Sequence, residues 1–156
     1  MPNKSKHKPA SILAVSSGGG HWTQLLLLSE AFESNTVHYV STDLNLSAIE
    51  THKDISVVID ADLDNKFKLL LLSIQVAILV IRKRPDCVIS TGAAPGYFAV
   101  LFGKLIGAKT IWVDSMANYS ELSVSGKHAS KICDLCLTQW PKLADNKRIK
   151  HLGSLL

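Results

Sequence analysis

Cysteine is scarce in this chain of 156 residues. The three that occur, Cys87, Cys133 and Cys136, give an odd count, and no secretory signal peptide precedes them. We therefore expect a reducing, cytosolic environment. The spacing of Cys133 and Cys136 would suit zinc or a redox pair, but no second C-x-x-C and no nearby paired histidines complete a site. Buried, inert thiols are the favoured interpretation, and no metal is expected.

Two nucleotide-binding motifs are also missing. The chain contains neither the G-x-G-x-x-G of dinucleotide-binding folds nor the G-x-x-x-x-G-K-[ST] of P-loop NTPases. Asp43 nevertheless lies roughly twenty residues beyond the first glycines, where an acidic residue would hold a ribose. A nucleotide- or dinucleotide-binding protein therefore stays an alternative, although the sequence predicts no cofactor.

No uninterrupted apolar run is long enough to span a membrane. The most apolar segment, Phe67 to Ile81, is broken by Ser73 and Gln75, whereas a bilayer core needs about twenty predominantly apolar residues. It predicts a helix that packs on a sheet, or one that lays a face in a membrane interface, and both can hold together. The basic residues that follow it would bind an anionic membrane surface: Arg82, Lys83 and Arg84.

What the sequence has in quantity is apolar residues. They make up 47% of the chain against 19% charged residues, which excludes a disordered protein. The mean hydropathy of +0.18 is high for a freely soluble domain, so we expect part of the apolar surface to need a partner. The net charge of +4 suits a membrane surface or a phosphate ligand. Residues 1–10 are polar and basic and contain Pro2 and Pro9, which predicts a flexible tail. The length predicts one domain at residues 11–156.

Predicted strands alternate with predicted helices along the domain. This order favours an α/β fold, a Rossmann-like parallel sheet with helices on both faces. We expect strands at Ile12–Val15, Val37–Val40, Ile55–Ile59, Cys87–Ser90, Thr110–Val113, Leu135–Thr138 and within Ile149–Leu156. We expect helices from near Trp22, at Phe67–Ile81, at Tyr97–Ile106 and around His128–Ile132.

A glycine-rich turn follows the first predicted strand. Ser16 and Ser17 precede three glycines, Gly18, Gly19 and Gly20, and His21 stands where the next helix begins. Glycines let a ligand approach the main chain closely, and the amides at a helix start attract anions. His21 can bind a phosphate or sugar hydroxyl or accept a proton, or it can be a simple cap. The alternative for the whole turn is a tight connection whose glycines serve packing alone.

A second such turn follows the fourth predicted strand, and an acidic residue ends the fifth. Ligands of parallel sheets bind at the carboxyl ends of the strands, so these polar loops should converge on one site. The candidate residues of the second turn and the acidic residue are Thr91, Gly92, Ala93, Pro95, Gly96 and Asp114.

Four motifs in order resemble a known family. They are S-S-G-G-G-H-W-x-Q-L near the start, then S-T-G-A-A-P-G, I-W-V-D-S-M-A-N and L-T-Q-W-P. The chain resembles, from about Ile12 to Gly153, the PssD-type polysaccharide-biosynthesis subunits. These are bacterial relatives of the membrane-anchoring half of the eukaryotic dolichol-linked N-acetylglucosaminyltransferase.

The resemblance implies half of a glycosyltransferase. In this family a GT-B enzyme similar to MurG is split in two, and such a chain is the N-terminal, acceptor-facing domain. A small partner subunit binds the nucleotide-sugar donor, the acceptor is a polyprenyl-pyrophosphate-linked sugar, and no nucleic acid takes part. By this likeness the residues Gly18 to His21 contact the acceptor's diphosphate or sugar, and Gly92 to Gly96 form a second such loop. Asp114 lies near the acceptor, His21 and Asp114 are the catalytic candidates, and we expect the chain alone to be inactive.

One departure from the family concerns the membrane. Eukaryotic relatives begin with a membrane-spanning helix, whereas this chain begins with the polar, basic residues Met1 to Pro9. We expect peripheral attachment to the cytoplasmic face of the inner membrane through the Phe67 to Arg84 segment. A non-catalytic scaffold that recruits the donor-binding subunit is the alternative from another functional class.

Overall fold

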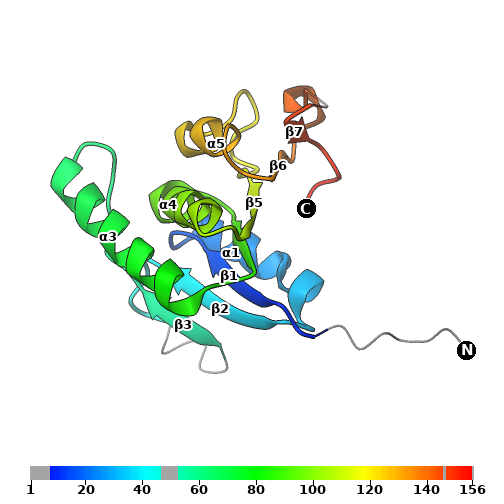
Figure 1. The fold of residues 1–156 in the computed structure, drawn as a ribbon. Coiled ribbons are helices and arrows are strands. Elements are labelled where there is room, and N and C mark those ends of the chain that lie inside the picture. Colours follow the sequence, from blue (N-terminus) through cyan, green and yellow to red (C-terminus); the bar gives the residue numbers. More distant parts are fainter. Residues whose placement is uncertain (1–7, 47–52, 146, 156) are drawn as a thin grey trace, which may run out of the picture.

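The computed structural model describes residues 8–46, 53–145 and 147–155, which form a three-layer α/β fold (Figure 1). The expected flexible tail falls largely on residues 1–7, which lie outside the described residues. Seven parallel strands form one sheet in the order β3-β2-β1-β4-β5-β6-β7. Their bounds are β1 Ser11–Val15, β2 Thr36–Ser41, β3 Asp54–Val57, β4 Cys87–Ser90, β5 Lys109–Val113, β6 Leu135–Leu137 and β7 Ile149–Lys150. The predicted α/β class with a parallel sheet is confirmed.

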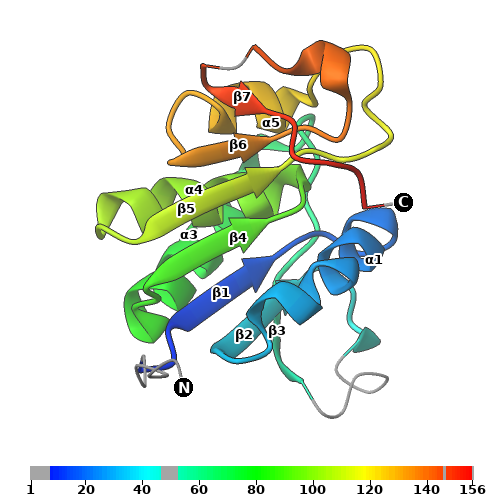
Figure 2. The same cartoon turned by 90° about the vertical axis from the view of Figure 1, so that its right-hand side faces the viewer.

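Helices cover both faces of the sheet. In Figure 2, α1 lies in front of the sheet and α3, α4 and α5 lie behind it. The helices are α1 Gly20–Leu27, α3 Lys66–Lys83, α4 Ala93–Leu105 and α5 Val124–Ala129, with 3₁₀ turns η1 Ser29–Phe32 and η2 Pro141–Leu143. This arrangement explains the apolar strands, because a strand that is covered on both faces needs apolar residues at every position.

The first strand contributes to the apolar cores on both faces of the sheet. Leu13 and Val15 face the layer of α3 and α4, whereas Ile12 and Ala14 face α1. Because successive side chains of a strand point to opposite faces, the run fills both cores at once. Neighbouring strands supply the same pattern, and Trp112 is fully buried.

Several predicted boundaries were wrong. The third strand stops at Val57 and not at Ile59, because the Ile59 amide donates to Gln75 Oε1 of α3 at 2.9 Å instead of continuing the sheet. The last strand, Ile149–Lys150, lies within the range expected for it. The helix expected from Tyr97 already begins at Ala93, since Pro95 is tolerated in a first turn whose amides have no helical partner.

Another wrong boundary concerns the short helix expected around residues 128–132. It runs earlier, from Val124 to Ala129, because Ser123 caps it. The Ser123 hydroxyl accepts a hydrogen bond from the Gly126 amide at 2.8 Å. A serine in this position satisfies one of the amides that a helix start leaves without a partner.

Helix α3 has two different apolar faces. Leu72, Val76 and Val80 are buried against the sheet. The opposite side carries an exposed row that we call the apolar stripe: Phe67, Leu70, Leu71, Ile74, Ile78 and Ile81. The helix therefore belongs to the core on one side and leaves an apolar surface on the other. Among the helices described here, none is long and apolar enough to cross a membrane.

Candidate active site

The strand register brings the predicted loops to one edge of the sheet. Val15 at the end of β1 pairs with Val40 of β2 and with Ser90 of β4, and Ser90 pairs with Trp112 of β5. The turns after these strands therefore start at one level, side by side. The predicted convergence of the two glycine turns and the loop at Asp114 on the carboxyl edge is what the topology produces.

His21 joins the two glycine turns. Its Nδ1 lies 2.9 Å from the Thr91 carbonyl oxygen, and the Thr91 hydroxyl donates to the His21 carbonyl oxygen at 2.7 Å. A carbonyl oxygen can only accept, so Nδ1 carries the proton and the lone pair of a neutral imidazole is on Nε2. The half-buried ring is thus held with its basic nitrogen turned away from the anchoring bond.

Gly92 gives this ring its space. Its φ is 139°, a conformation that favours glycine, and a Cβ atom there would lie 2.5 Å from the ring atoms Cε1 and Nδ1 of His21. Ala93 follows with a φ of 64°, an uncommon value for a residue with a side chain. Backbone strain of this kind persists where the surrounding structure enforces it, often at functional sites.

The starts of α1 and α4 both face this edge. Neither helix has a side-chain cap, and Gly19 and Gly92 are the residues before their first turns. Gly19 has a φ of 66°, and a Cβ atom on Gly19 or Gly20 would meet nothing within 4 Å. Open space beside uncapped helix amides is the arrangement that binds phosphates and other anions.

The flanks of the two turns are closed by neighbouring residues. The Gly18 amide donates to Thr42 Oγ1 at 3.1 Å, and a Cβ atom on Gly18 would lie 3.1 Å from the Cβ of Asp43. Gly96 is buried under Ser90, whose hydroxyl would meet a Cβ atom there at 1.8 Å. Gly18 and Gly96 therefore serve packing, while Gly19 and Gly20 stay open. Ser17 is half-buried beside them, and Pro95 is buried in the first turn of α4.

Asp114 is buried and surrounded by donors. Oδ1 accepts from Trp112 Nε1 at 3.0 Å and from the Ser123 hydroxyl at 2.7 Å. Oδ2 accepts from Asn118 Nδ2 at 3.1 Å and from the Ser123 amide at 3.0 Å. Gly126 leaves the room for this carboxylate, since a Cβ atom there would lie 2.3 Å from Oδ1. The geometry is that of a group that holds the loop after β5.

A buried glutamine on α1 organises the same region. Gln24 Nε2 donates to Ser115 Oγ at 3.0 Å, and Gln24 Oε1 accepts from the Met116 amide at 3.1 Å. Gln139 Nε2 donates both to Gln24 Oε1 at 2.8 Å and to the Asp114 carbonyl at 3.2 Å. We call Gln24, Ser115 and Gln139 the glutamine network. It connects α1 to the loops after β5 and β6.

The glutamine network was not among the predicted site residues. Its members are polar side chains within otherwise apolar stretches, and buried polar groups of this kind require partners. The signal in the sequence is Gln24, a polar residue that interrupts the apolar pattern of α1. Its partners, however, lie 91 and 115 residues further along the chain.

The prediction of buried, inert thiols is confirmed for Cys136 but not for Cys133. Cys136 is buried, and its pKa is raised because its thiol donates a hydrogen bond to Cys133 and because of burial, so it stays a neutral thiol. Cys133 is half-buried, and the same hydrogen bond lowers its pKa. In the part of the chain that the structure describes, no three His, Cys, Asp or Glu side chains form a group that could hold a metal ion.

Comparisons with known proteins identify the family of this chain. A family model described as "Oligosaccharide biosynthesis protein Alg14 like" matches residues 57–155. The chain belongs to this family. It is similar to the UDP-N-acetylglucosamine transferase subunit ALG14 of Yarrowia lipolytica, with 24% identity over 98% of this chain and 84% of that protein. A shorter match joins it to the subunit of the same name from Schizosaccharomyces pombe, with 36% identity over 44% of this chain and 36% of that protein.

Solved structures show the fold of the Alg14-like chain. MurG of Acinetobacter baumannii superposes with a TM-score of 0.76 and 13% identity, over 92% of this chain and 45% of that one. UDP-N-acetylglucosamine 2-epimerase of Rickettsia bellii gives 0.71 and 12%, over 95% and 46%. The chain thus spans less than half the length of these structures and has the fold of a GT-B half-domain, as predicted.

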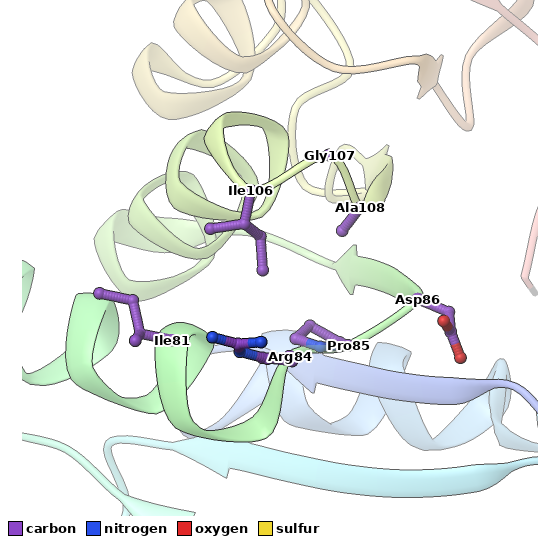
Figure 3. A pocket seen from close by; sticks show the side chains of 7 residues that line it. All are labelled: Ile81, Arg84, Pro85, Asp86, Ile106, Gly107 and Ala108. Atoms are coloured by element: carbon purple, nitrogen blue, oxygen red, sulfur yellow. The ribbon is translucent and has the colours of Figure 1, made fainter.

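The Alg14-like chain carries its basic cluster, Arg82, Lys83 and Arg84, at the other edge of the sheet. Arg84 ends α3 with a φ of 43°, and its amide donates to the Val80 carbonyl at 2.9 Å. A cavity of about 510 Å³ lies there, where Ile81 and Arg84 face Ile106 from the end of α4 (Figure 3). It lies at the amino edge of the strands, away from the glycine turns. The basic cluster and the candidate active site are therefore separate features.

Proposed function

We propose that this chain is the acceptor-binding subunit of a two-chain glycosyltransferase of the PssD type, acting at the cytoplasmic face of the inner membrane. A small partner subunit binds the nucleotide sugar. The pair transfers the sugar to a polyprenyl-pyrophosphate-linked saccharide. Because the relatives are named UDP-N-acetylglucosamine transferase subunits, UDP-N-acetylglucosamine is the first donor to test.

The observation that carries this proposal is the pairing of the two glycine turns through His21. Two uncapped helix starts and an imidazole with its basic nitrogen free of the anchoring bond lie at the carboxyl edge of a half-GT-B fold. Helix amides suit a diphosphate, and a histidine suits the hydroxyl that receives the sugar. The missing half of the fold is what a donor-binding partner supplies.

In the proposed reaction the acceptor's hydroxyl oxygen attacks the anomeric carbon of the donor sugar. The bond from that carbon to the nucleotide diphosphate breaks, and the diphosphate leaves with the electron pair. His21 Nε2 takes the proton from the attacking hydroxyl, while the Thr91 carbonyl keeps the imidazole oriented. The starts of α1 and α4 hold the acceptor's diphosphate.

Asp114 has a different role in this proposal. All four of its hydrogen bonds come from donors within the chain, so it positions the loop after β5 beside the site. The apolar stripe of α3 and the basic cluster bring the domain to the membrane, where the lipid acceptor resides.

The test is sugar transfer to a polyprenyl-pyrophosphate-linked saccharide by this chain, by the partner, and by the two together. We expect transfer only by the pair, because donor and acceptor domains must face each other. In the pair, His21→Ala should lower turnover at least about a hundredfold if His21 is the base, since a lost neutral hydrogen bond removes only about tenfold. Full activity of this variant with the complex intact would make His21 a structural cap of the turn, and transfer by the single chain would contradict the two-chain proposal.

A further inference from the structure

An apolar groove lies beside the first glycine turn, between the ends of β2 and β3 and the first turns of α3. Its volume is about 580 Å³, within the range of small-molecule sites. Its apolar lining comes from Leu44, Val57, Val58, Ile59 and Leu71. None of these residues belongs to the candidate active site described above.

A contact between α3 and the chain after β3 helps to shape the groove. The Gln75 side chain accepts a hydrogen bond from the Ile59 amide at 2.9 Å, which fixes the chain after β3 against the helix. Leu44 projects from the loop after β2 and is 78% exposed. An exposed leucine beside further apolar residues marks a surface that is suited to an apolar ligand.

Two residues connect the groove to its surroundings. Thr42 lines it and also accepts the hydrogen bond of the Gly18 amide at 3.1 Å, so the groove begins next to the first glycine turn. Leu71 lines it and also belongs to the apolar stripe of α3. The apolar surface is thus continuous from the glycine turn, through the groove, to the stripe.

The charges of the groove fit a ligand with an anionic head. Lys68 lines the groove together with Leu71, and the uncapped start of α1 lies beyond Thr42. Asp60 also lines the groove and Asp43 packs against Gly18, so both carboxylates disfavour an anion on the groove side of Gly18. A diphosphate is therefore favoured at Gly19 and Gly20, with only an apolar chain running into the groove.

We infer that this groove binds the first isoprene units of the acceptor's lipid, next to its diphosphate. The inference rests on the proposed function, and it adds where the lipid leaves the active site. The units further along the lipid then pass Leu71 and reach the membrane along the apolar stripe. Binding of a short isoprenoid diphosphate needs no membrane, which makes the groove testable with the soluble chain.

The experiment measures the affinity of the full chain for farnesyl diphosphate and for inorganic pyrophosphate by calorimetry. We expect farnesyl diphosphate to bind at least about tenfold more tightly, a factor that burial of only two methylene groups supplies. The variant Leu44→Gln, Leu71→Gln should bind both ligands equally, with unchanged affinity for pyrophosphate. Both side chains are partly or largely exposed, so this variant should fold.

The matched control is Ile78→Gln, an equally apolar position on the stripe but outside the groove. It should keep the full preference for farnesyl diphosphate. Equal binding of the two ligands by the unchanged chain would overturn the inference, and so would an equal loss in the control, which would place the lipid on the stripe.

The results distinguish a wrong assignment of the groove from a wrong proposed function. Sugar transfer by the two-chain enzyme without a farnesyl preference overturns the groove alone. A farnesyl preference that is lost in the Leu44→Gln, Leu71→Gln variant, with no transfer by the pair, supports the groove and overturns the glycosyltransferase.

Discussion

Replacing Asp114 by asparagine separates a structural carboxylate from a catalytic one. The substitution keeps the shape but turns one acceptor oxygen into a donating amide. If the amide takes the place of Oδ1, it meets the indole N–H of the fully buried Trp112. If it takes the place of Oδ2, it meets the amide N–H of Ser123. Either orientation leaves a donor without an acceptor.

The structure sets the size of the effect. An unsatisfied buried donor costs about 1–3 kcal/mol, and the remaining hydrogen bonds lose the charge of the carboxylate. The Ser123 hydroxyl oxygen, which accepts from the Gly126 amide, has a second lone pair for the new amide, but its own proton, now given to Asp114, would then need another acceptor. We expect the free energy of unfolding to fall by about 2–4 kcal/mol.

The assay is urea unfolding followed by tryptophan fluorescence, together with turnover by the two-chain enzyme under conditions where the variant is folded. The matched control, Asp64→Asn, changes an exposed carboxylate and should stay within about 0.5 kcal/mol. A stability of Asp114→Asn equal to that of the control, with turnover reduced a hundredfold or more, would refute the structural role and make Asp114 the base.

Three further predictions concern the glycine beside His21, the ion pair of Asp134 and the basic cluster. Gly92→Ala should lower both stability and turnover, because its Cβ atom displaces His21, whereas Gly107→Ala, with a φ of 85° and open space, should cost backbone strain alone. Asp134, whose pKa is lowered to about 2 chiefly by Lys104, should stabilise the fold by about 1–2 kcal/mol at pH 7, discounted for its exposure. A carboxylate whose pKa is lowered by folding stabilises the fold fully above its unfolded-state pKa, and this contribution is lost as the pH falls through the folded-state pKa. Asp134→Asn should therefore lose its effect on stability as the pH falls from about 5 to 2. Glutamates in the basic cluster should release the chain from anionic liposomes in flotation, at about 1 kcal/mol for each residue, and unchanged flotation would leave α3 as a core helix only.

Most of the sheet follows from local patterns. The strand that ends at Ser90 was predicted to the residue, and those at Val15 and Val113 to within one residue at their starts. Short apolar runs bounded by polar turns can be recognised because a strand covered on both faces is uniformly apolar. The glycine turns and their convergence follow in turn from parallel topology, since it sends the carboxyl ends of neighbouring strands to one edge.

The faces of α3 could not be read from its sequence. Leu70 and Leu72 are equally apolar, yet Leu72 is buried and Leu70 is 57% exposed. Helical spacing shows which residues share a face, but a segment that is apolar all round does not show which face the sheet covers. The structure confirms that one face of the helix packs on the sheet, whereas contact of the other face with a membrane stays a prediction.

The hydrogen bond that orients His21 could not be predicted from the sequence either, because its acceptor is a backbone atom. The side chain was predicted at the site, but its partner is the Thr91 carbonyl, a group that every residue possesses. The space for the ring depends on the missing Cβ of Gly92. A carbonyl acceptor and an absent methyl group leave no pattern in a single sequence, so the orientation of the imidazole needed the structure.

The glutamine network gives the recognised motifs a physical meaning. The glutamine of the first motif, the serine after Asp114 in the third and the glutamine of the fourth are one hydrogen-bonded group, Gln24, Ser115 and Gln139. Gln139 Oε1 also accepts from the Leu155 amide at 3.1 Å, so the end of the described chain is connected to α1. Substitutions in these motifs should therefore lower activity through the fold, by moving α1 and the turn it carries. Among these motif residues, only His21 has a basic nitrogen free of the anchoring bond. Its substitution is expected to lower the activity of the enzyme while the free energy of unfolding is largely preserved.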